Sequence, residues 1–439
     1  MSYLRYPEYP EYRESGVEWL GEVPAEWRTP PFYAHFQTQL GKMLDSRKIT
    51  GENLFPYLRN TDVQWKGINV TGLPQMDFSL SDQLKFRLIE GDLLVCEGGE
   101  SGRCFVWPGS ELPIYYQKAL HRIRSLNDSR ATSPWLMWVF RVAVPLGIFK
   151  DASNPATIDH LPAEKLREFR FALPPLPEQR QIAAFLDREC AAMDGLMAKQ
   201  GRLIKLLAEK RQALISHTVT KGLDLHAKLK DSGIEWLGEV PEGWKVLPVG
   251  RVFRESVELN RPDLPILSVS IHHGISDREL TEEESDRKQQ KSENRSVYKF
   301  VQTGDIAYNM MRAWQGAFGA STVDGIVSPA YTIARPLKKV ESKYFELLLR
   351  SPAGASESKR YSRGITDFRL RLYWDEFKAI RIPLPPLPEQ RAIVTYLDEA
   401  CGKIDTLVAK AESAITLLKE RRTALISAAV TGKIDVREL

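Results

Sequence analysis

The stretch LPPLPEQRQIAAFLD at residues 173–187 decides the fold, and nearly the same stretch, LPPLPEQRAIVTYLD, returns at residues 384–398. Eleven of the fifteen positions are identical, and the copies stand 211 residues apart in a chain of 439. Proline is favoured in the first turn of a helix because its missing N–H has no intrahelical partner there, and an acidic residue behind it complements the helix dipole. The repeat therefore predicts two helix starts, at Pro177 and Pro388.

Both predicted helices are long. No proline or strong turn signal interrupts residues 177–217 or 388–428, so each helix would be about 60 Å long at 1.5 Å per residue. A 4-3 alternation of apolar residues runs along both, which is the pattern of one helix packing on another. We expect an antiparallel coiled coil within the chain, with pairing to a second copy as the alternative. The predicted seam consists of Ile182, Leu186, Met193, Leu196, Leu203, Leu207, Leu214, Ile393, Leu397, Ile404, Leu407, Leu418 and Leu425.

A second repeat indicates that whole halves of the chain are duplicated. SGVEWLGEVP at 15–24 returns as SGIEWLGEVP at 232–241, with nine of ten positions identical. A weaker echo links EGDLLVCEGGESGR at 90–103 with TGDIAYNMMRAWQG at 303–316, each a Gly-Asp turn followed by a β-rich run. Each half thus consists of a WLGEVP segment, a variable globular part and a PPLPEQR helix.

The duplication predicts that the segments beside the ends of the two long helices are equivalent. The chain leaves the first helix through VTKGLDLHAKLKDSG and enters the second WLGEVP segment, whereas it ends soon after the second helix with VTGKIDVREL. If the halves are equivalent, residues 11–24 pack beside the end of the second helix, as residues 228–241 pack beside the end of the first.

The globular parts are predicted to be α+β, within a chain long enough for two or more domains. The apolar fraction of 43% and the charged fraction of 27% are typical of a soluble globular protein. The strand candidates are 92–96, 104–107, 264–270 and 326–334, and the helix candidates are 135–142, 163–169 and 343–350.

Composition limits the classes of function. The longest apolar run, at 134–149, is too short and too broken to span a bilayer, and the N-terminus does not have the pattern of a signal peptide. Cys96, Cys104, Cys190 and Cys401 have no C-x-x-C spacing, which favours free thiols over a zinc site and fits a reducing cytoplasm. The net charge of +4 permits nucleic-acid binding without demanding it.

No catalytic motif stands out. EGGESGR at 97–103 lacks the Walker lysine and the G-x-G-x-x-G order, so we interpret it as a turn or a DNA-backbone loop. NPAT at 154–157 lacks the aromatic residue of the N-P-P-aromatic loop that holds a flipped adenine in amino-methyltransferases. His272 and His273 have no third ligand at metal-binding spacing and read as a polar surface pair. We expect a chain without an active site, a metal or a bound cofactor.

Basic and aromatic residues are interleaved in both halves, at 47–67 and 115–124 in the first and at 294–300, 309–319 and 359–374 in the second. Such mixtures suit reading base edges and holding phosphates, although a solvated surface over ordinary core aromatics is the alternative. The candidate DNA-binding residues are Arg59, Asn60, Lys66, Arg103, Gln117, Lys118, His121, Arg295, Asn309, Arg312, Trp314, Gln315, Arg360 and Arg363.

Together these motifs resemble the specificity subunit of type I restriction–modification enzymes. The resemblance rests on WLGEVPAEW and WLGEVPEGW, on GDLLVCEGG and GDIAYNMMRAWQG, and above all on LPPLPEQR twice before a long helix, and it extends from about residue 15 to 435. It implies two target-recognition domains that each read one half of a bipartite, asymmetric site in double-stranded DNA. The helices would form a ruler between them, giving pseudo-twofold symmetry.

The resemblance also implies partners and a division of labour. Two methyltransferase subunits would dock, one on each repeated frame, and bring S-adenosylmethionine to methylate adenine N6. Restriction subunits, when present, would bring ATP and Mg²⁺ chemistry. The chain itself would be a non-catalytic, cytoplasmic subunit that binds no cofactor and no membrane.

The implied domains are a first target-recognition domain at 1–172, a first spacer helix at 173–220, a second target-recognition domain at 221–383, and a second spacer helix with the C-terminal tail at 384–439. One alternative is the specificity part of a modification-only or single-chain methyltransferase system. A fused methyltransferase would need an N-P-P-Y-type loop and a glycine-rich cofactor strand, neither of which is found. A coiled-coil scaffold without a DNA role is the other alternative, and it would not explain the divergent basic loops.

Overall fold

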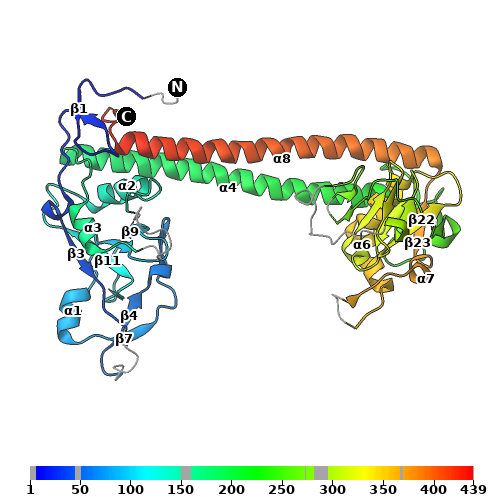
Figure 1. Ribbon diagram of the computed structural model, residues 1–439, viewed down its shortest axis with the longest axis horizontal. Coiled ribbons are helices and arrows are strands. Elements are labelled where there is room, and N and C mark those ends of the chain that lie inside the picture. The colour runs from blue at the N-terminus through cyan, green and yellow to red at the C-terminus, as the bar shows by residue number, and fades with distance from the viewer. Residues whose placement is uncertain are drawn as a thin grey trace. The chain divides into compact units, whose positions relative to one another are not determined.

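The computed structural model in Figure 1 describes residues 6–44, 51–149, 160–271, 273–280, 295–365 and 369–438. The chain forms two compact units, one of Met1–Lys199 with Ala414–Leu439 and the other of Gln200–Ser413. The long helices α4 (Leu176–Lys221) and α8 (Leu387–Val430) each contribute one part to each unit. Both helices begin one residue before the proline at which the sequence predicted a start.

The first unit is built on a four-stranded antiparallel sheet with the order β3-β11-β8-β9. These strands are β3 (Phe36–Leu40), β11 (Leu120–Ser125), β8 (Leu93–Cys96) and β9 (Cys104–Val106). Helices α2 (Ser133–Ala143) and α3 (Ala163–Glu168) share a core with this sheet, to which the start of α4 and the end of α8 also contribute. A three-stranded sheet of β10 (Tyr115–Tyr116), β4 (Leu54–Leu58) and β7 (Gln75–Asp77) packs with α1 (Leu80–Phe86) in a smaller core. Two hairpins complete the unit: β1 (Tyr12–Glu14) with β2 (Glu22–Pro24), and β5 (Val63–Gln64) with β6 (Gly67–Ile68).

The four-stranded sheet of the first unit recurs in the second unit. Its four-stranded antiparallel sheet has the order β15-β22-β19-β20, formed by β15 (Phe253–Ser256), β22 (Tyr331–Pro336), β19 (Ile306–Asn309) and β20 (Phe318–Ala320). In both sheets the first strand in sequence pairs with the last, and the last pairs with the second. Helix α5 (Ser342–Arg350) follows the last strand as α2 does in the first unit, and α6 (Pro352–Tyr361) and α7 (Trp374–Phe377) come after it. The remaining strand pairs are β12 (Leu229–Asp231) with β13 (Glu239–Pro241), β14 (Lys245–Pro248) with β23 (Arg381–Leu384), β16 (Val269–Ser270) with β17 (Gly274–Ile275), and β18 (Lys299–Val301) with β21 (Gly325–Val327).

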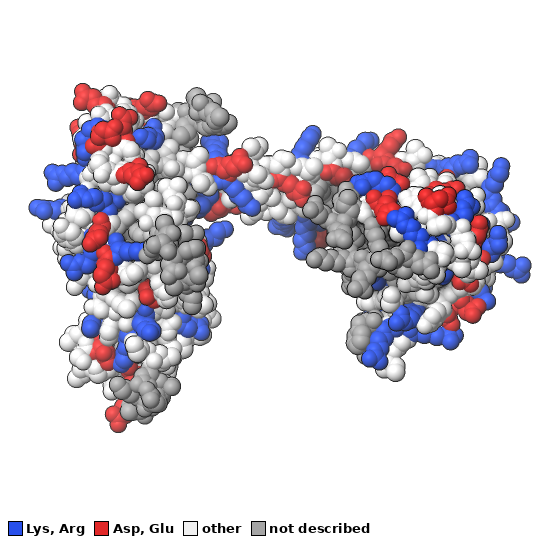
Figure 2. Space-filling model, viewed as in Figure 1, with Lys and Arg blue, Asp and Glu red and all other residues white. Residues whose placement is uncertain are grey.

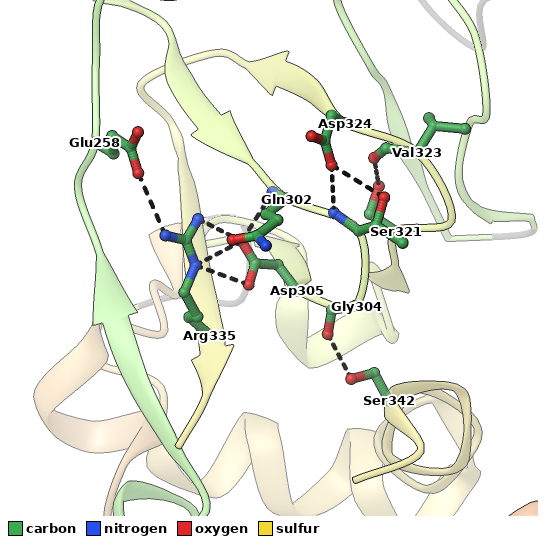
Figure 3. Close-up of polar contacts among 10 residues, drawn as sticks. Glu258, Gln302, Gly304, Asp305, Ser321, Val323, Asp324, Arg335 and Ser342 are labelled. Carbon is green, nitrogen blue, oxygen red and sulfur yellow. Dashed lines mark hydrogen bonds and ion pairs between the residues drawn. The ribbon is translucent and has the colours of Figure 1, made fainter. Parts of the chain in front are cut away.

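The Gly-Asp echo has a structural cause that Figure 3 displays in the second unit. Buried Asp305 accepts a hydrogen bond from the Gln302 backbone N–H at 2.9 Å, which closes the turn before β19. Arg335 on the neighbouring strand donates its Nε and Nη2 to the same carboxylate, at 3.1 and 2.9 Å. In the first unit Asp92 and Arg124 make the same contacts, at 2.6 Å from Nε and 2.7 Å from Nη2. A turn and two strands are thereby held by one aspartate in each half.

The glutamate of PPLPEQR anchors the tryptophan that follows WLGEVP. Trp27 Nε1 donates to Glu178 Oε1 at 3.1 Å, and Trp244 Nε1 donates to Glu389 Oε2 at 3.0 Å. In the first unit the Tyr9 hydroxyl also donates to Glu178 Oε1, at 2.5 Å. Burial raises the pKa of Glu178 above its usual value. The two repeated motifs, about 150 residues apart in sequence, therefore bind each other in both halves.

The glutamine of PPLPEQR joins the start of each long helix to a helix of the globular part. Gln179 donates its Nε2 to Pro174 O at 2.8 Å and accepts the N–H of Thr132, the N-cap residue of α2, at 3.1 Å. Gln390 likewise donates to Pro385 O at 2.8 Å and accepts the N–H of the α5 N-cap residue, Glu341, at 2.8 Å.

The prediction that residues 11–24 lie beside the end of the second helix is confirmed. Lys433 Nζ, just past α8, donates to Glu22 O at 2.8 Å, and Asp435 N–H donates to Pro7 O at 2.7 Å. At the end of α4, Lys221 Nζ donates to Glu239 O. In both units, the backbone carbonyl of the glutamate in the E-V-P segment thus accepts a hydrogen bond from a lysine at the end of a long helix.

Most of the predicted seam is buried, but three of its residues are not. Ile182, Leu186 and Met193 lie in the core of the first unit, and Ile393 and Leu397 lie in the core of the second. Leu207, Ile404 and Leu425 are also buried, and Leu214 and Leu418 are partly buried. The prediction is wrong for Leu196, Leu203 and Leu407, which are exposed. These three residues lie in the middle parts of the two helices, outside the hydrophobic cores that cover the helix ends.

The shorter predicted elements follow the sequence with two differences. The candidate strand at 264–270 keeps only Val269–Ser270, and Ile266 forms an isolated parallel bridge with Ile326. The candidate strand at 326–334 is divided into β21 and β22 around Pro329, which has no N–H to donate to a ladder. The helices expected at 135–142, 163–169 and 343–350 are found as α2, α3 and α5.

The glutamine contacts predict a measurable difference between two neighbouring residues. Gln179→Ala should lower the free energy of unfolding by about 1–3 kcal/mol, since it leaves the Thr132 N–H and the Pro174 carbonyl buried without their partner. Gln181→Ala, two positions along the same helix and exposed, should change it by less than about 0.5 kcal/mol. Denaturant unfolding of the two variants checks this, and equal midpoints would contradict the assigned role of Gln179.

Candidate nucleic-acid interface

Several of the candidate residues lie on or beside an equivalent loop in the two units. The connection between β8 and β9 (residues 97–103) and the connection between β19 and β20 (residues 310–317) join the equivalent pair of strands in the two sheets. The repeated frame therefore presents two divergent loops from equivalent positions.

In the first unit the glycine-rich loop closes around Asn60. Arg103 Nη2 donates to Asn60 O at 2.9 Å, and Asn60 Nδ2 donates to Gly98 O at 3.2 Å. Glu100 accepts Arg103 Nη1 at 2.9 Å and the indole N–H of Trp65 at 2.5 Å. Asn60 and Arg103 are therefore engaged with the protein itself, and they fix the loop to the segment before β5.

The glycines of this loop serve its shape. Gly102 has φ +88°, and a Cβ there would lie 2.5 Å from Val144 Cγ2 on the segment after α2. Only glycine fits this position without displacing a neighbour. This local packing explains the glycine-rich sequence, in agreement with its interpretation as a turn rather than a nucleotide site.

Arg59 lies beside Asn60 and is held by one carboxylate. Its Nε and Nη2 donate to the two oxygens of Asp62 at 2.9 and 2.8 Å, and Asp62 also accepts the Arg59 backbone N–H. Burial acts to raise the pKa of Asp62, but the hydrogen bonds from Arg59 outweigh it and bring the pKa below its usual value. The pair is therefore present above the pH at which a free aspartate ionises, and it is lost as pH falls through the lowered pKa.

The β5–β6 hairpin carries Lys66 outward from a rigid base. Lys66 is exposed, whereas the preceding Trp65 is held through its carbonyl by Arg141 of α2. The Arg141 guanidinium lies over the ring of Trp138, 4.5 Å from its centroid, and burial lowers the pKa of Arg141. This contact places an exposed cation on an element tied to the unit's core.

The candidate residues of the third segment of the first unit, from β10 to β11, differ in their exposure to solvent. Lys118 is exposed and Gln117 is half-buried. His121 is buried in β11 with its Nε2 2.8 Å from Leu161 O, and burial lowers the pKa of the ring. The prediction that His121 lies near DNA is corrected by this placement, because both faces of β11 are covered at that position.

In the second unit the β19–β20 loop is a compact turn. Asn309 Oδ1 accepts the Met311 N–H at 2.9 Å, and Trp314 Nε1 donates to Met311 O at 3.0 Å. Gln315 is exposed and Arg312 is half-buried. Lys359 of α6 lies 5.3 Å from the centroid of the Trp314 ring, so α6 adds a cation to this loop.

The arginines that follow belong to the end of α6 and the segment after it. Arg360 donates to both oxygens of buried Glu357, at 2.7 and 2.6 Å, and these hydrogen bonds raise its pKa. Arg363 pairs with Glu376 of α7. Figure 2 shows Lys and Arg side chains gathered over the segment between α6 and α7. Arg295 lies elsewhere in the unit, 3.4 Å from Glu279.

Arg371 is a basic residue of this region that was not singled out from the sequence. Arg371 is exposed and forms an isolated antiparallel bridge with Arg363. The cluster at 359–374 contains it, but only the fold shows that it stands opposite Arg363.

In the described part of the chain, no three His, Cys, Asp or Glu side chains are placed to hold a metal ion, and no helix is long and apolar enough to cross a membrane. Cys96, Cys104, Cys190 and Cys401 are buried and form no disulfide. The NPAT segment at 154–157 and His272 lie outside the described residues.

Comparison with known proteins supports a DNA-recognition role. Residues 36–200 match the family model of the type I restriction modification DNA specificity domain. Along 437 residues the chain is 23% identical to a putative type I restriction enzyme MjaX specificity subunit of Methanocaldococcus jannaschii, covering 95% of this chain and 96% of that one. It is also 23% identical over 312 residues to the EcoBI specificity subunit of Escherichia coli, covering 65% and 62% of the two chains.

Solved structures share the fold. A chain from a study of complex assembly and conformational transition in a type I restriction–modification system matches with a TM-score of 0.65 at 16% identity, covering 93% of this chain and 98% of that one. The HsdS subunit of Thermoanaerobacter tengcongensis matches with a TM-score of 0.56 at 17% identity, covering 94% and 98%.

These findings define first a class, that of proteins carrying a DNA specificity domain. Within it, the chain is similar over nearly its whole length to specificity subunits of type I restriction enzymes, as the repeated motifs indicated.

The contacts of Arg103 and Lys66 predict opposite effects for two nearby cations. Arg103→Ala should lower the stability of the first unit by about 1–3 kcal/mol, because it removes hydrogen bonds to Asn60 O and Glu100. It should leave the salt dependence of DNA binding unchanged. Lys66→Ala should change the free energy of unfolding by less than about 0.5 kcal/mol. It should make the decrease of the logarithm of the DNA-binding constant with the logarithm of salt concentration less steep by about 1. Binding to duplex DNA across a salt series, with unfolding of each variant, tests this; a reduced slope for Arg103→Ala would show that Arg103 contacts DNA instead.

Proposed function

We propose that the chain reads a bipartite, asymmetric DNA sequence, one half-site with each globular part, and positions methyltransferase subunits over it. The observation that carries this proposal is the repeated four-stranded sheet, which presents unlike loops from equivalent positions. A frame that is kept while its loops differ suits two unlike half-sites. Arg, Lys, Asn and Gln in and beside these loops provide donors for phosphates and base edges.

The long helices act as an antiparallel coiled coil that spaces the two recognition parts. In the first unit Asp194 of α4 lies 3.5 Å from Arg422 of α8, and in the second Arg211 of α4 lies 3.4 Å from Asp405 of α8. As many positions separate Asp194 from Arg211 as separate Asp405 from Arg422, which is the register of two helices that run in opposite directions. This supports the predicted pairing within one chain over pairing with a second copy.

The methyltransferase subunits dock on the repeated segments, once per half. Repeated residues fall into two groups in the structure. Gln179 and Gln390 are buried and serve the chain's own packing, whereas the following Arg180 and Arg391 are exposed. Repeated and exposed positions of this kind suit a partner that binds the same surface twice.

The chemistry is supplied by these partners. S-adenosylmethionine is held by the methyltransferase subunits, which transfer its methyl group to adenine N6. ATP and Mg²⁺ belong to restriction subunits where such subunits are present. The specificity subunit contributes recognition and geometry and carries out no catalytic step, and a modification-only complex would use it in the same way.

Mapping of methylated adenines tests the division into half-sites. DNA from cells that carry the complex should show methylation within a two-part sequence with a fixed spacer. Arg312→Ala, in the β19–β20 loop, should weaken binding to that sequence by about 1–3 kcal/mol if it holds a guanine, and should relax only one of the two halves. A one-part sequence, or relaxation of both halves, would contradict the proposal.

A further inference from the structure

Arg363 and Arg371 face each other across a narrow ribbon of the second unit. The Arg363 N–H donates to Arg371 O at 2.9 Å, and the Arg371 N–H donates to Arg363 O at 2.9 Å. Residues that exchange both hydrogen bonds in an antiparallel pair are directly opposite, and their side chains leave from the same face. Like charges in this position repel each other, so the pair is unfavourable unless an anion lies nearby.

One arginine of this pair is bound by a carboxylate of the protein itself. Glu376 of α7 is bonded to Arg363, and its side chain is only 11% exposed while that of Arg363 is 74% exposed. The neighbouring Asp375 is bonded to Lys378 at 2.6 Å. In the described residues no hydrogen bond or ion pair of the Arg371 side chain is found. The largely buried Glu376 carboxylate therefore balances Arg363 alone, and the exposed guanidinium of Arg371 leaves a net positive charge.

The ribbon is joined to the candidate interface of this unit. Leu372, next to Arg371, is buried and donates its N–H to Met310 O at 2.9 Å, at the start of the β19–β20 loop. Lys359 connects the preceding helix to Trp314 of the same loop. The arginine pair is thus fixed to the loop that is equivalent to the glycine-rich loop of the first unit.

We propose that Arg363 and Arg371 form a clamp for a backbone phosphate of DNA, and that Glu376 is the positioning residue that aims Arg363 at it. The inference rests on the proposed DNA-recognition function and assigns it a phosphate site. A phosphodiester oxygen between the two guanidinium groups removes their mutual repulsion and accepts charge-assisted hydrogen bonds from both. Glu376 occupies one edge of the Arg363 guanidinium and so holds it in a single orientation before DNA arrives.

The experiment measures binding of the full chain, with any subunits that copurify, to a duplex of arbitrary sequence over a salt series. A phosphate contact is independent of sequence, so the target need not be known. K here is the association constant for the duplex. Arg371→Ala should make the negative slope of log K against log salt less steep by about 1, and should lower K by roughly threefold to tenfold. Arg371→Lys should keep the slope, because it keeps the charge, and lose part of the affinity. Unchanged unfolding midpoints confirm that both variants are folded.

The decisive variant is Glu376→Gln, because two explanations predict opposite signs for it. If Glu376 acts only as a negative charge near DNA, its removal raises K, as Asp375→Asn should do as the matched control. If it positions Arg363, K falls by about threefold or more, since the freed side chain must be ordered on binding. A rise in K equal to that of Asp375→Asn, or an unchanged slope in Arg371→Ala, overturns the clamp. Absence of any salt-dependent binding by the unmodified chain would instead overturn the proposed function itself.

Discussion

The fold depends on the hydrogen bonds that tie the start of each long helix to the globular part before it. A glutamate accepts the indole N–H of the tryptophan after WLGEVP, and the next glutamine accepts the first backbone N–H of a globular helix. These groups are largely buried, and a buried polar group that loses its hydrogen-bond partner destabilises the folded state. A change in one motif would remove the partner of the other, which explains why both motifs are found in each half with nearly identical sequences. The repeat is therefore explained first by the chain's own packing, and docking of a partner can use only the residues that this packing leaves exposed.

This constraint separates what stays constant from what varies. The four-stranded sheet, its Asp–Arg pair and the helix junction recur with the same contacts in both units. The connection after the second strand of the sheet is free to differ, and it does: the first unit builds it around Asn60 and Arg103, and the second around Trp314 with cations from α6. A recognition protein gains from this arrangement, since a loop can change its sequence without loss of the frame that presents it.

Local rules made the helices and the Gly-Asp turns predictable from the sequence. Pro177 and Pro388 mark helix starts within one residue, because proline and the following acid act on the adjoining turn alone. Burial was less predictable where it depends on distant segments. Leu196 satisfies the heptad pattern but is exposed, since nothing in the pattern tells whether a second layer covers the helix. His121 stands among basic residues in the sequence and is buried, because its strand is covered on both faces. Arg371 could not be distinguished from its basic neighbours until its position opposite Arg363 was known.

The central claim is that two equivalent halves are joined in a circular order, with the segments around Pro7 and Asp435 lying together at one of the two junctions. Asp435 N–H donates to Pro7 O at 2.7 Å, so a short linker suffices to join these segments. The most direct measurement is the methylation pattern produced with a circularly permuted chain that starts at Lys228 and has the segments around Pro7 and Asp435 linked. The account predicts methylation of the same adenines as with the unpermuted chain. A soluble, folded permutant that no longer supports this methylation would contradict the equivalence of the two junctions.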